Sequence, residues 1–134
     1  MRTFLCLVFF AIVLLSVEAK EQTIKVRGQV ICDKRSIRNA LVELREHDTF
    51  DPDDTLATIH TDKDGNFQLT GTEDEVTSIK PYIRITHTCD VQDRATCHRI
   101  SDFEIPADKI DNGEYDMNFV NLNLKGHNDK EICN

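Results

Sequence analysis

The sequence predicts an all-β protein, an antiparallel β-sandwich of seven to eight strands. Apolar residues recur with a period of two rather than 3.6 along most of the chain, which is the repeat of a half-buried strand. The alternating segments are short, and Gly, Pro, Asn and Asp separate them at intervals of roughly 8–12 residues. Many short strands with turns between them are typical of two packed sheets.

The first nineteen residues have the pattern of a secretory signal peptide. Arg2 precedes an uncharged run from Phe4 to Leu15, and small or apolar residues stand at the cleavage positions Val17 and Ala19. As a helix this run spans about 18 Å, against roughly 30 Å for the hydrocarbon core of a bilayer. We therefore predict a signal peptide over 1–19, a single domain over 20–134, and a secreted, extracellular protein that does not span the membrane.

Charge excludes one class of function. The chain carries 16 Lys and Arg against 24 Asp and Glu, a formal net charge of −8, and it has no Trp. An acidic chain does not bind nucleic acid phosphates through its overall charge, and a chain with few aromatic residues offers no platform on which bases could stack. We expect no nucleic acid partner.

The strands before residue 71 follow from alternation. Over 23–32, Ile24, Val26, Val30 and Cys32 share the inward face, while Lys25, Arg27 and Gln29 share the outward one. Gly28 marks a bulge or a close approach within this strand. Residues 40–46 alternate again, and the segments 55–61 and 66–70 form a hairpin around the turn 62–65, where Gly65 supplies a positive φ.

The later strands are less regular. Over 79–88, Ile83 and Ile85 face inward and Tyr82 faces outward, while Pro81 suggests that this strand starts at a sheet edge. Segment 98–105 loses its alternation, which suggests a bulge between residues 100 and 103. Residues 106–110 read as one helical turn. In the last expected strand, 115–124, the apolar phase switches at 119–120 and indicates another bulge.

Four cysteines remain once Cys6 leaves with the signal peptide. An even number of cysteines in an exported domain fits two disulfides, and Cys32, Cys89, Cys97 and Cys133 allow three pairings. We favour Cys89–Cys97 across a short loop and Cys32–Cys133 tying the tail to an early strand, although the sequence alone does not distinguish the three.

Two groups of side chains are candidates for binding. Five cations occupy outward strand positions and would form a basic binding face, a local anion site on an acidic protein: Lys25, Arg27, Arg45, Lys80 and Arg84. The ordinary alternative is a solvated surface with cross-strand ion pairs to acids such as Glu43. Oxygen ligands for calcium are offered by Asp62, Asp64 and Asn66, or by the acidic loop around Asp51, Asp53 and Asp54.

Neither metal pattern is strong. Gly65 is the fourth residue counted from Asp62, whereas a calcium loop has its glycine at the sixth, so a turn is the favoured reading. His87, Cys89, Cys97 and His98 have a spacing that zinc tolerates. In an exported protein we expect disulfides there instead. We therefore predict no metal and no cofactor.

Several segments together resemble the nematode transthyretin-like family of small secreted proteins. The matching segments are 26–32, 51–54, 61–67, 85–89, Cys97 with 105–106, 115–116, 121–124 and the tail Cys133. The resemblance implies a transthyretin-like (prealbumin) sandwich and secretion. It also implies an extracellular binding role, such as bridging phosphatidylserine-bearing dying cells to an engulfment receptor.

The resemblance extends to an enzyme of the same fold, but the match is incomplete. Hydroxyisourate hydrolases share a C-terminal Tyr-Arg-Gly-Ser motif with His and Arg in one cleft, whereas this chain ends differently and offers only His60 and Arg84 on neighbouring candidate strands. Function belongs to the site rather than the fold. The favoured hypothesis is a non-enzymatic adaptor that binds an extracellular receptor or an anionic lipid surface. A carrier of a small apolar ligand is the alternative, and a hydrolase is the least favoured.

Overall fold

Residues 20–48, 51–75 and 79–134 are described by a computed structural model, and the predicted signal peptide, residues 1–19, lies outside them. The strands are β1 (Lys20–Cys32), β2 (Arg35–Ser36), β3 (Leu41–His47), β4 (Asp54–His60), β5 (Asn66–Glu75), β6 (Lys80–His87), β7 (Cys97–Glu104), β8 (Glu114–Asn121) and β9 (Asn128–Cys133). The expected helical turn is confirmed as a 3₁₀ turn, Ala107–Lys109.

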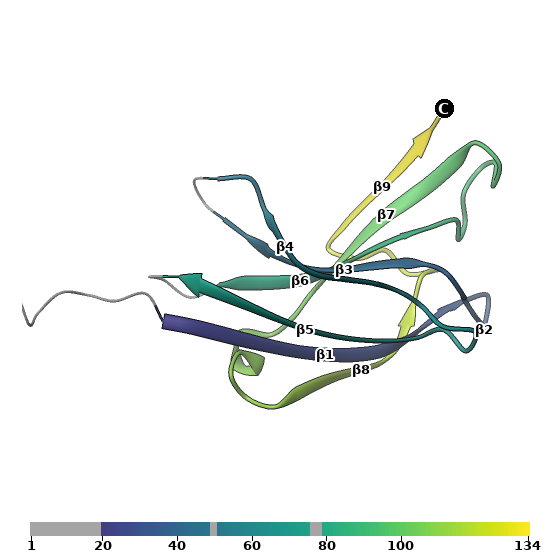
Figure 1. Cartoon of the computed structure of the whole chain (residues 1–134). Coiled ribbons are helices and arrows are strands. Elements are labelled where there is room, and N and C mark those ends of the chain that lie inside the picture. The colour runs from purple at the N-terminus through teal and green to yellow at the C-terminus, as the bar shows by residue number, and fades with distance from the viewer. Residues whose placement is uncertain (1–19, 49–50, 76–78) are drawn as a thin grey trace, which may run out of the picture.

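Two sheets form the sandwich. The four-stranded sheet has β1 at its centre, with β5 on one side, β8 on the other and the short β2 at its end, and the five-stranded sheet has the order β4-β3-β6-β7-β9. Figure 1 shows β3 and β6 lying over β1 and β5. The predicted all-β sandwich is confirmed, with one difference in strand direction: β8 pairs with β1 in parallel.

The core lies between the sheets, where the predicted alternation is confirmed. Ile24, Val26 and Val30 of β1 are fully buried, while Lys25 and Arg27 between them are exposed. They face the inward side chains of the other sheet, which are also fully buried: Val42, Leu44, Ile83 and Ile85. Each such aliphatic side chain contributes roughly 1.5–3 kcal/mol through burial.

The hairpin between β4 and β5 has the predicted turn. Gly65 has φ +78°, and a Cβ there would lie 2.6 Å from the carbonyl oxygen of Val30. The Asp62 carboxylate accepts hydrogen bonds from the backbone N–H groups of Asp64 and Asn66, both at 2.9 Å. Glycine is required here both by the backbone conformation and by the close approach of β1.

The predicted bulge in the 115–124 segment is confirmed and has a clear effect. The register between β1 and β8 shifts so that two residues, Met117 and Asn118, lie opposite Gly28. Asn118 takes a left-handed φ of +56°, a conformation that Asn tolerates better than most residues. The extra residue reverses the side-chain alternation, so Phe119 turns outward and Val120 turns into the core.

Strands β6 and β7 differ from the sequence prediction. β6 lies between β3 and β7 rather than at an edge, and Pro81 occupies only its second position. The pairing of β6 with β7 runs without interruption from Tyr82 to His87. The prediction of a bulge between residues 100 and 103 is therefore wrong. The alternation is lost there because the inward residues include polar ones, Arg99 and Ser101.

The C-terminal strand β9 is absent from the sequence prediction. It pairs with β7 at the edge of the five-stranded sheet, and none of its six residues is buried. An exposed edge strand has no apolar face to alternate, so periodicity cannot reveal it. Figure 1 shows β7 and β9 rising away from the four-stranded sheet. Within the described residues, no helix has the length and apolar character needed to cross a membrane.

The predicted disulfide pairing is wrong. The bridges are Cys32–Cys89, with Cα atoms 5.9 Å apart, and Cys97–Cys133, with Cα atoms 4.0 Å apart. The tail does not reach β1, because β9 joins β7 in the other sheet and its register places Cys133 directly opposite Cys97. That leaves Cys89, after the end of β6, to cross to the end of β1. One bridge therefore links the sheets and the other fastens the edge strand.

Candidate functional site

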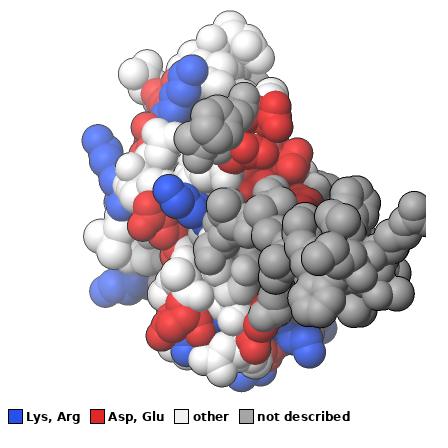
Figure 2. All heavy atoms as spheres, turned by 90° about the vertical axis from the view of Figure 1, so that its left-hand side faces the viewer, with Lys and Arg blue, Asp and Glu red and all other residues white. Residues whose placement is uncertain are grey.

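The five predicted cations do not form one basic stripe. Lys25 and Arg27 lie on the outer face of the four-stranded sheet, whereas Arg45, Lys80 and Arg84 lie on the five-stranded sheet. The two groups therefore point away from each other across the sandwich. On the face in Figure 2, lysine and arginine side chains are scattered among acidic ones and make no continuous basic surface.

The arginines among them are already ion-paired. Arg27 contacts Glu114 at 3.2 Å and Asp116 at 3.1 Å. Arg84 makes a bidentate pair with Asp102, through bonds of 2.8 and 3.0 Å. Hydrogen bonding to that carboxylate raises the pKa of Arg84. Cross-strand pairing, the ordinary alternative for these positions, therefore describes Arg27 and Arg84. Arg45 lies 3.5 Å from Glu43 of its own strand.

Tyr82 is the centre of a polar cluster on the outer face of the five-stranded sheet. It faces outward as predicted but is fully buried, because His47 stacks on its ring with centroids 4.4 Å apart. Its hydroxyl accepts a hydrogen bond from Arg45 Nε at 3.1 Å and donates one to Asp53. Burial, followed by the bond to Asp53, raises the pKa of Tyr82. This tyrosine is therefore held neutral as a structural hydrogen-bond bridge.

Asp53 completes this cluster. Its carboxylate also lies 2.9 Å from Nδ1 of His47. Burial alone would raise its pKa, but the hydrogen bond from Tyr82 and the neighbouring His47 and Arg45 outweigh burial and lower the pKa. Asp53 of the predicted acidic loop thus supplies a partner for the side chains of Tyr82 and His47.

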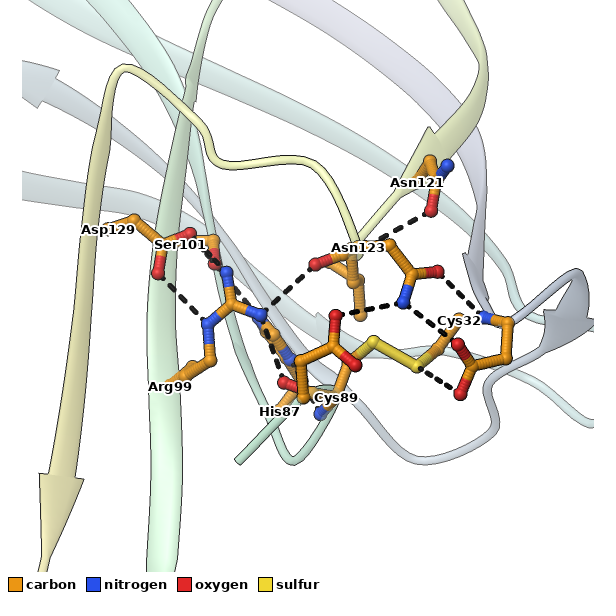
Figure 3. Close-up of a disulfide and its surroundings, with 11 residues drawn as sticks. Cys32, His87, Cys89, Arg99, Ser101, Asn121, Asn123 and Asp129 are labelled. Carbon is orange, nitrogen blue, oxygen red and sulfur yellow. Dashed lines mark hydrogen bonds and ion pairs between the residues drawn. A yellow bond between two sulfur atoms is a disulfide. The ribbon is translucent and has the colours of Figure 1, made fainter. Parts of the chain in front are cut away.

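A second polar cluster is buried beneath β9 (Figure 3). His87 Nδ1 accepts the backbone N–H of Cys89 at 3.0 Å, so the ring proton is on Nε2, which lies 2.9 Å from Ser101 Oγ. Ser101 in turn donates to Asp129 at 2.8 Å. The serine proton therefore points at the carboxylate and the histidine is the donor, which is the reverse of a nucleophile activated by a histidine base.

Electrostatics in this buried cluster also favour a structural role. Burial, with the Arg99 charge beside it, lowers the pKa of His87 from 6.5 to about 4. Burial would raise the pKa of Asp129, but hydrogen bonds from Arg99 and Ser101 reverse this and lower it. Arg99 also donates to the carbonyl oxygens of Cys89 and Leu122. The cluster ties β7, β9 and two loops together beside the Cys32–Cys89 bridge.

Two of the metal candidates from the sequence have ligand atoms that are engaged elsewhere. Asp62 is engaged with the turn backbone, and Cys89 and Cys97 are in separate disulfides. Among the described residues, carboxylate oxygens of Glu46, Asp54 and Glu73 lie within 4.8 Å of one another. Acidic groups gather in this way in many proteins without an ion, so proximity alone does not define a metal site.

Two open grooves mark the surface. The Phe119 groove, of about 620 Å³, crosses the outer face of the four-stranded sheet to the end of β4, and its lining includes Arg27, Gln29, Ile59, His60, Asn66, Gln68, Asn118 and Phe119. The Lys80 groove, of about 480 Å³, lies at the end of the five-stranded sheet and is lined by His47, Ile79, Lys80, Pro81, Glu104, Ile105, Pro106 and Ala107. Phe119 is 66% exposed and Ile59 is 38% exposed.

Sequence reasoning missed both the buried polar cluster and the Phe119 groove. Arg99 and Ser101 share the inward face of β7 with Cys97, but polar side chains give no apolar period to detect. The groove did have a signal, namely the phase switch at 119–120. His60 and Arg84, the pair considered for a hydrolase, lie on β4 and β6 with β3 between them.

Together, the fold and its surface define a class of protein: a disulfide-linked β-sandwich whose buried ionisable groups pair with one another and whose open grooves lie on the surface. Comparisons with known proteins agree with this architecture. The sequence profile of the transthyretin-like family matches residues 27–106, and the chain belongs to that family.

Relatives in Caenorhabditis elegans cover most of the chain. Transthyretin-like protein 16 is 41% identical over 99% of both chains. Transthyretin-like protein 33 is 37% identical over 75% of this chain and 71% of its own, and transthyretin-like protein 5 is 34% identical over 88% and 86%.

Among solved structures, a much larger enzyme contains a similar fold. A 9R-lipoxygenase from Cyanothece superposes with a TM-score of 0.52 and 18% identity, over 75% of this chain but only 16% of that enzyme. Because the chain spans about a sixth of the lipoxygenase, the likeness concerns the fold alone.

Proposed function

We propose that this chain is a secreted, non-enzymatic extracellular binding or adaptor protein, which bridges a cell-surface ligand and a receptor in recognition or engulfment. The observation that carries the proposal is the pair of surface grooves on different sheets. The Phe119 groove crosses the outer face of the four-stranded sheet and reaches β4, whereas the Lys80 groove lies at the other sheet, on β3, β6 and β7. An adaptor requires two such surfaces, since it must contact two partners at once.

Three further features support this role. The segment 1–19 has the pattern of a signal peptide, and two disulfides are typical of oxidising compartments. In the buried cluster the serine donates its proton to a carboxylate, so it is not poised as a nucleophile. Both grooves are open to solvent, whereas a carrier of an apolar ligand would be expected to enclose it.

Secretion is tested by expressing the full chain in a eukaryotic cell and sequencing the protein recovered from the medium. We expect a mature protein that begins at Lys20. Retention of the full chain inside the cell would contradict the extracellular role.

Binding is tested with the secreted protein, labelled with a fluorophore, on intact cells and on vesicles. Phosphatidylcholine vesicles with and without phosphatidylserine, each with and without calcium, separate lipid bridging from receptor binding. Saturable binding to cells supports the proposal, and binding that also requires phosphatidylserine supports the bridging form. Failure to bind cells or vesicles under every condition would refute it.

A further inference from the structure

The exposed ring of Phe119 is a product of backbone architecture rather than chance. Without the bulge opposite Gly28, the alternation of β8 would turn residue 119 into the sandwich and residue 120 outward. The bulge places Asn118 in a left-handed conformation, which most non-glycine residues avoid. A sheet that accepts this conformation and leaves a phenylalanine 66% exposed provides a flat aromatic platform in the lining of the groove.

Planar polar side chains line the same groove as Phe119. Across the described parts of the chain, the side chains of His60, Asn66 and Asn118 make no hydrogen bond with protein groups, and all three are exposed in the groove. Gln29 and Gln68 use only their amide N–H groups, to Ser36 and Asp64 and to Glu114 respectively, so their carbonyl oxygens remain as acceptors. The amides of Asn66 and Asn118 each offer a donor beside an acceptor, and Gln29 and Gln68 add further acceptors.

The only Lys or Arg side chain in the groove is already paired. Arg27 contacts Glu114 and Asp116, Oδ1 of Asp62 accepts two hydrogen bonds from the turn backbone, and the aspartates Asp62 and Asp116 outnumber the one arginine. An anionic ligand, whether a lipid phosphate or a nucleic acid, would find no unpaired lysine or arginine there. A wholly apolar ligand would desolvate the free amides without replacing their hydrogen bonds to water, which costs free energy.

We propose that the Phe119 groove binds a neutral oligosaccharide. A sugar ring has an apolar C–H face that matches the exposed phenyl ring and a rim of hydroxyls that both donate and accept hydrogen bonds. Asn66, Asn118 and His60 supply complementary groups, and the volume of about 620 Å³ is within the range of small-molecule sites. The inference rests on the proposed function, since it names the ligand class of one surface of that binding protein.

The test is an NMR titration of the secreted, disulfide-bonded protein with four neutral trisaccharides: chitotriose, cellotriose, maltotriose and mannotriose. We expect at least one of them to shift the amide resonances of residues 27–29, 66–68 and 116–120. Phe119→Ala is expected to weaken that binding at least about tenfold. Asn118→Gly, which keeps the left-handed backbone and removes only the amide, should weaken it as well.

Leu124→Ala is the matched control, because Leu124 is 65% exposed but does not line the Phe119 groove. It should leave binding unchanged, and unshifted core resonances show that each variant is folded. Three results would overturn the proposal: no shift with any trisaccharide at about 10 mM, shifts confined to another surface, or equal loss of binding in Leu124→Ala.

Failure of this inference is separable from failure of the proposed function. Cell-surface binding that survives enzymatic removal of surface glycans and the Phe119→Ala change would refute the oligosaccharide site but retain the adaptor. A heparin-derived tetrasaccharide is the charged comparison, and a response to it alone would show that an anionic ligand is preferred and refute the neutral class.

Discussion

Acidification provides a sharp test of the buried polar cluster. His87 is 5% exposed, and its pKa in the folded protein is about 4, against 6.5 when unperturbed. Below pH 6.5 the unfolded chain binds a proton at this residue that the folded chain does not bind until about pH 4. Its contribution to stability is therefore complete above pH 6.5 and is lost as pH falls towards 4.

The size of this loss follows from the difference in pKa. A change from 6.5 to about 4, at 1.36 kcal/mol per pH unit, gives a loss of about 3 kcal/mol from His87 alone. The assay is urea unfolding with disulfides intact, at pH values between 7 and 4. His87→Gln is the informative variant, because its amide can accept from Cys89 N–H and donate to Ser101 Oγ without titrating.

We expect the free energy of unfolding of His87→Gln to fall less steeply with acidification than that of the wild type, by up to about 3 kcal/mol at pH 4. His98→Gln, which replaces a histidine on the opposite face of β7, is the control for the substitution itself. The reasoning is refuted if the difference between wild type and His87→Gln is the same at pH 7 and pH 4.

Other predictions concern the disulfides, the ion pairs and the turn. Mass mapping of unreduced peptides should find Cys32–Cys89 and Cys97–Cys133, and an 89–97 link would contradict the strand register. Arg84→Met should cost about 2–3 kcal/mol in urea unfolding, because Asp102 is left buried with only Asn128 at 3.3 Å, whereas Arg27→Met on the exposed sheet should cost less than about 1 kcal/mol. Equal costs would show that burial does not decide the strength of these pairs. Gly65→Ala should destabilise by more than about 2 kcal/mol, because a Cβ meets Val30 O at a positive φ, and Gly113→Ala, with open space around it, by about 1 kcal/mol or less. A similar melting temperature for both variants would contradict this.

The sequence predicts the sandwich because its central strands bury one face each. Ile24 and Val26 alternate with the cations Lys25 and Arg27, and Val30 continues the same face. Only one orientation of the strand buries these apolar side chains and leaves the cations in solvent. Gly65 and the phase switch at 119–120 are likewise local signals, since a turn and a bulge are determined by a few neighbouring residues.

Pairings between distant segments were not predictable in this way. The disulfides depend on which sheet β9 joins, and nothing in its polar sequence indicates β7 as its neighbour. Alternation predicts that Tyr82 points outward, but it does not predict which side chains pack over it. The ring of His47, which lies on another strand, stacks on Tyr82 and buries it. The candidate basic stripe failed for the same reason, because outward positions on two sheets share a sequence pattern without sharing a surface.

The position of β7 and β9 explains why polar groups are buried in one part of this sandwich. Figure 1 shows these strands extending away from the four-stranded sheet, and the inward face of β7 there carries the buried polar side chains of Arg99 and Ser101. Arg99 and Ser101 hydrogen-bond to Asp129 of β9, at a site where His87 remains neutral near pH 7. Each of these groups is therefore committed to another within the cluster. Among the described residues, the side chains of His60, Asn66 and Asn118 have no such partner and line the groove with Phe119, and that is where recognition of a ligand is expected to begin.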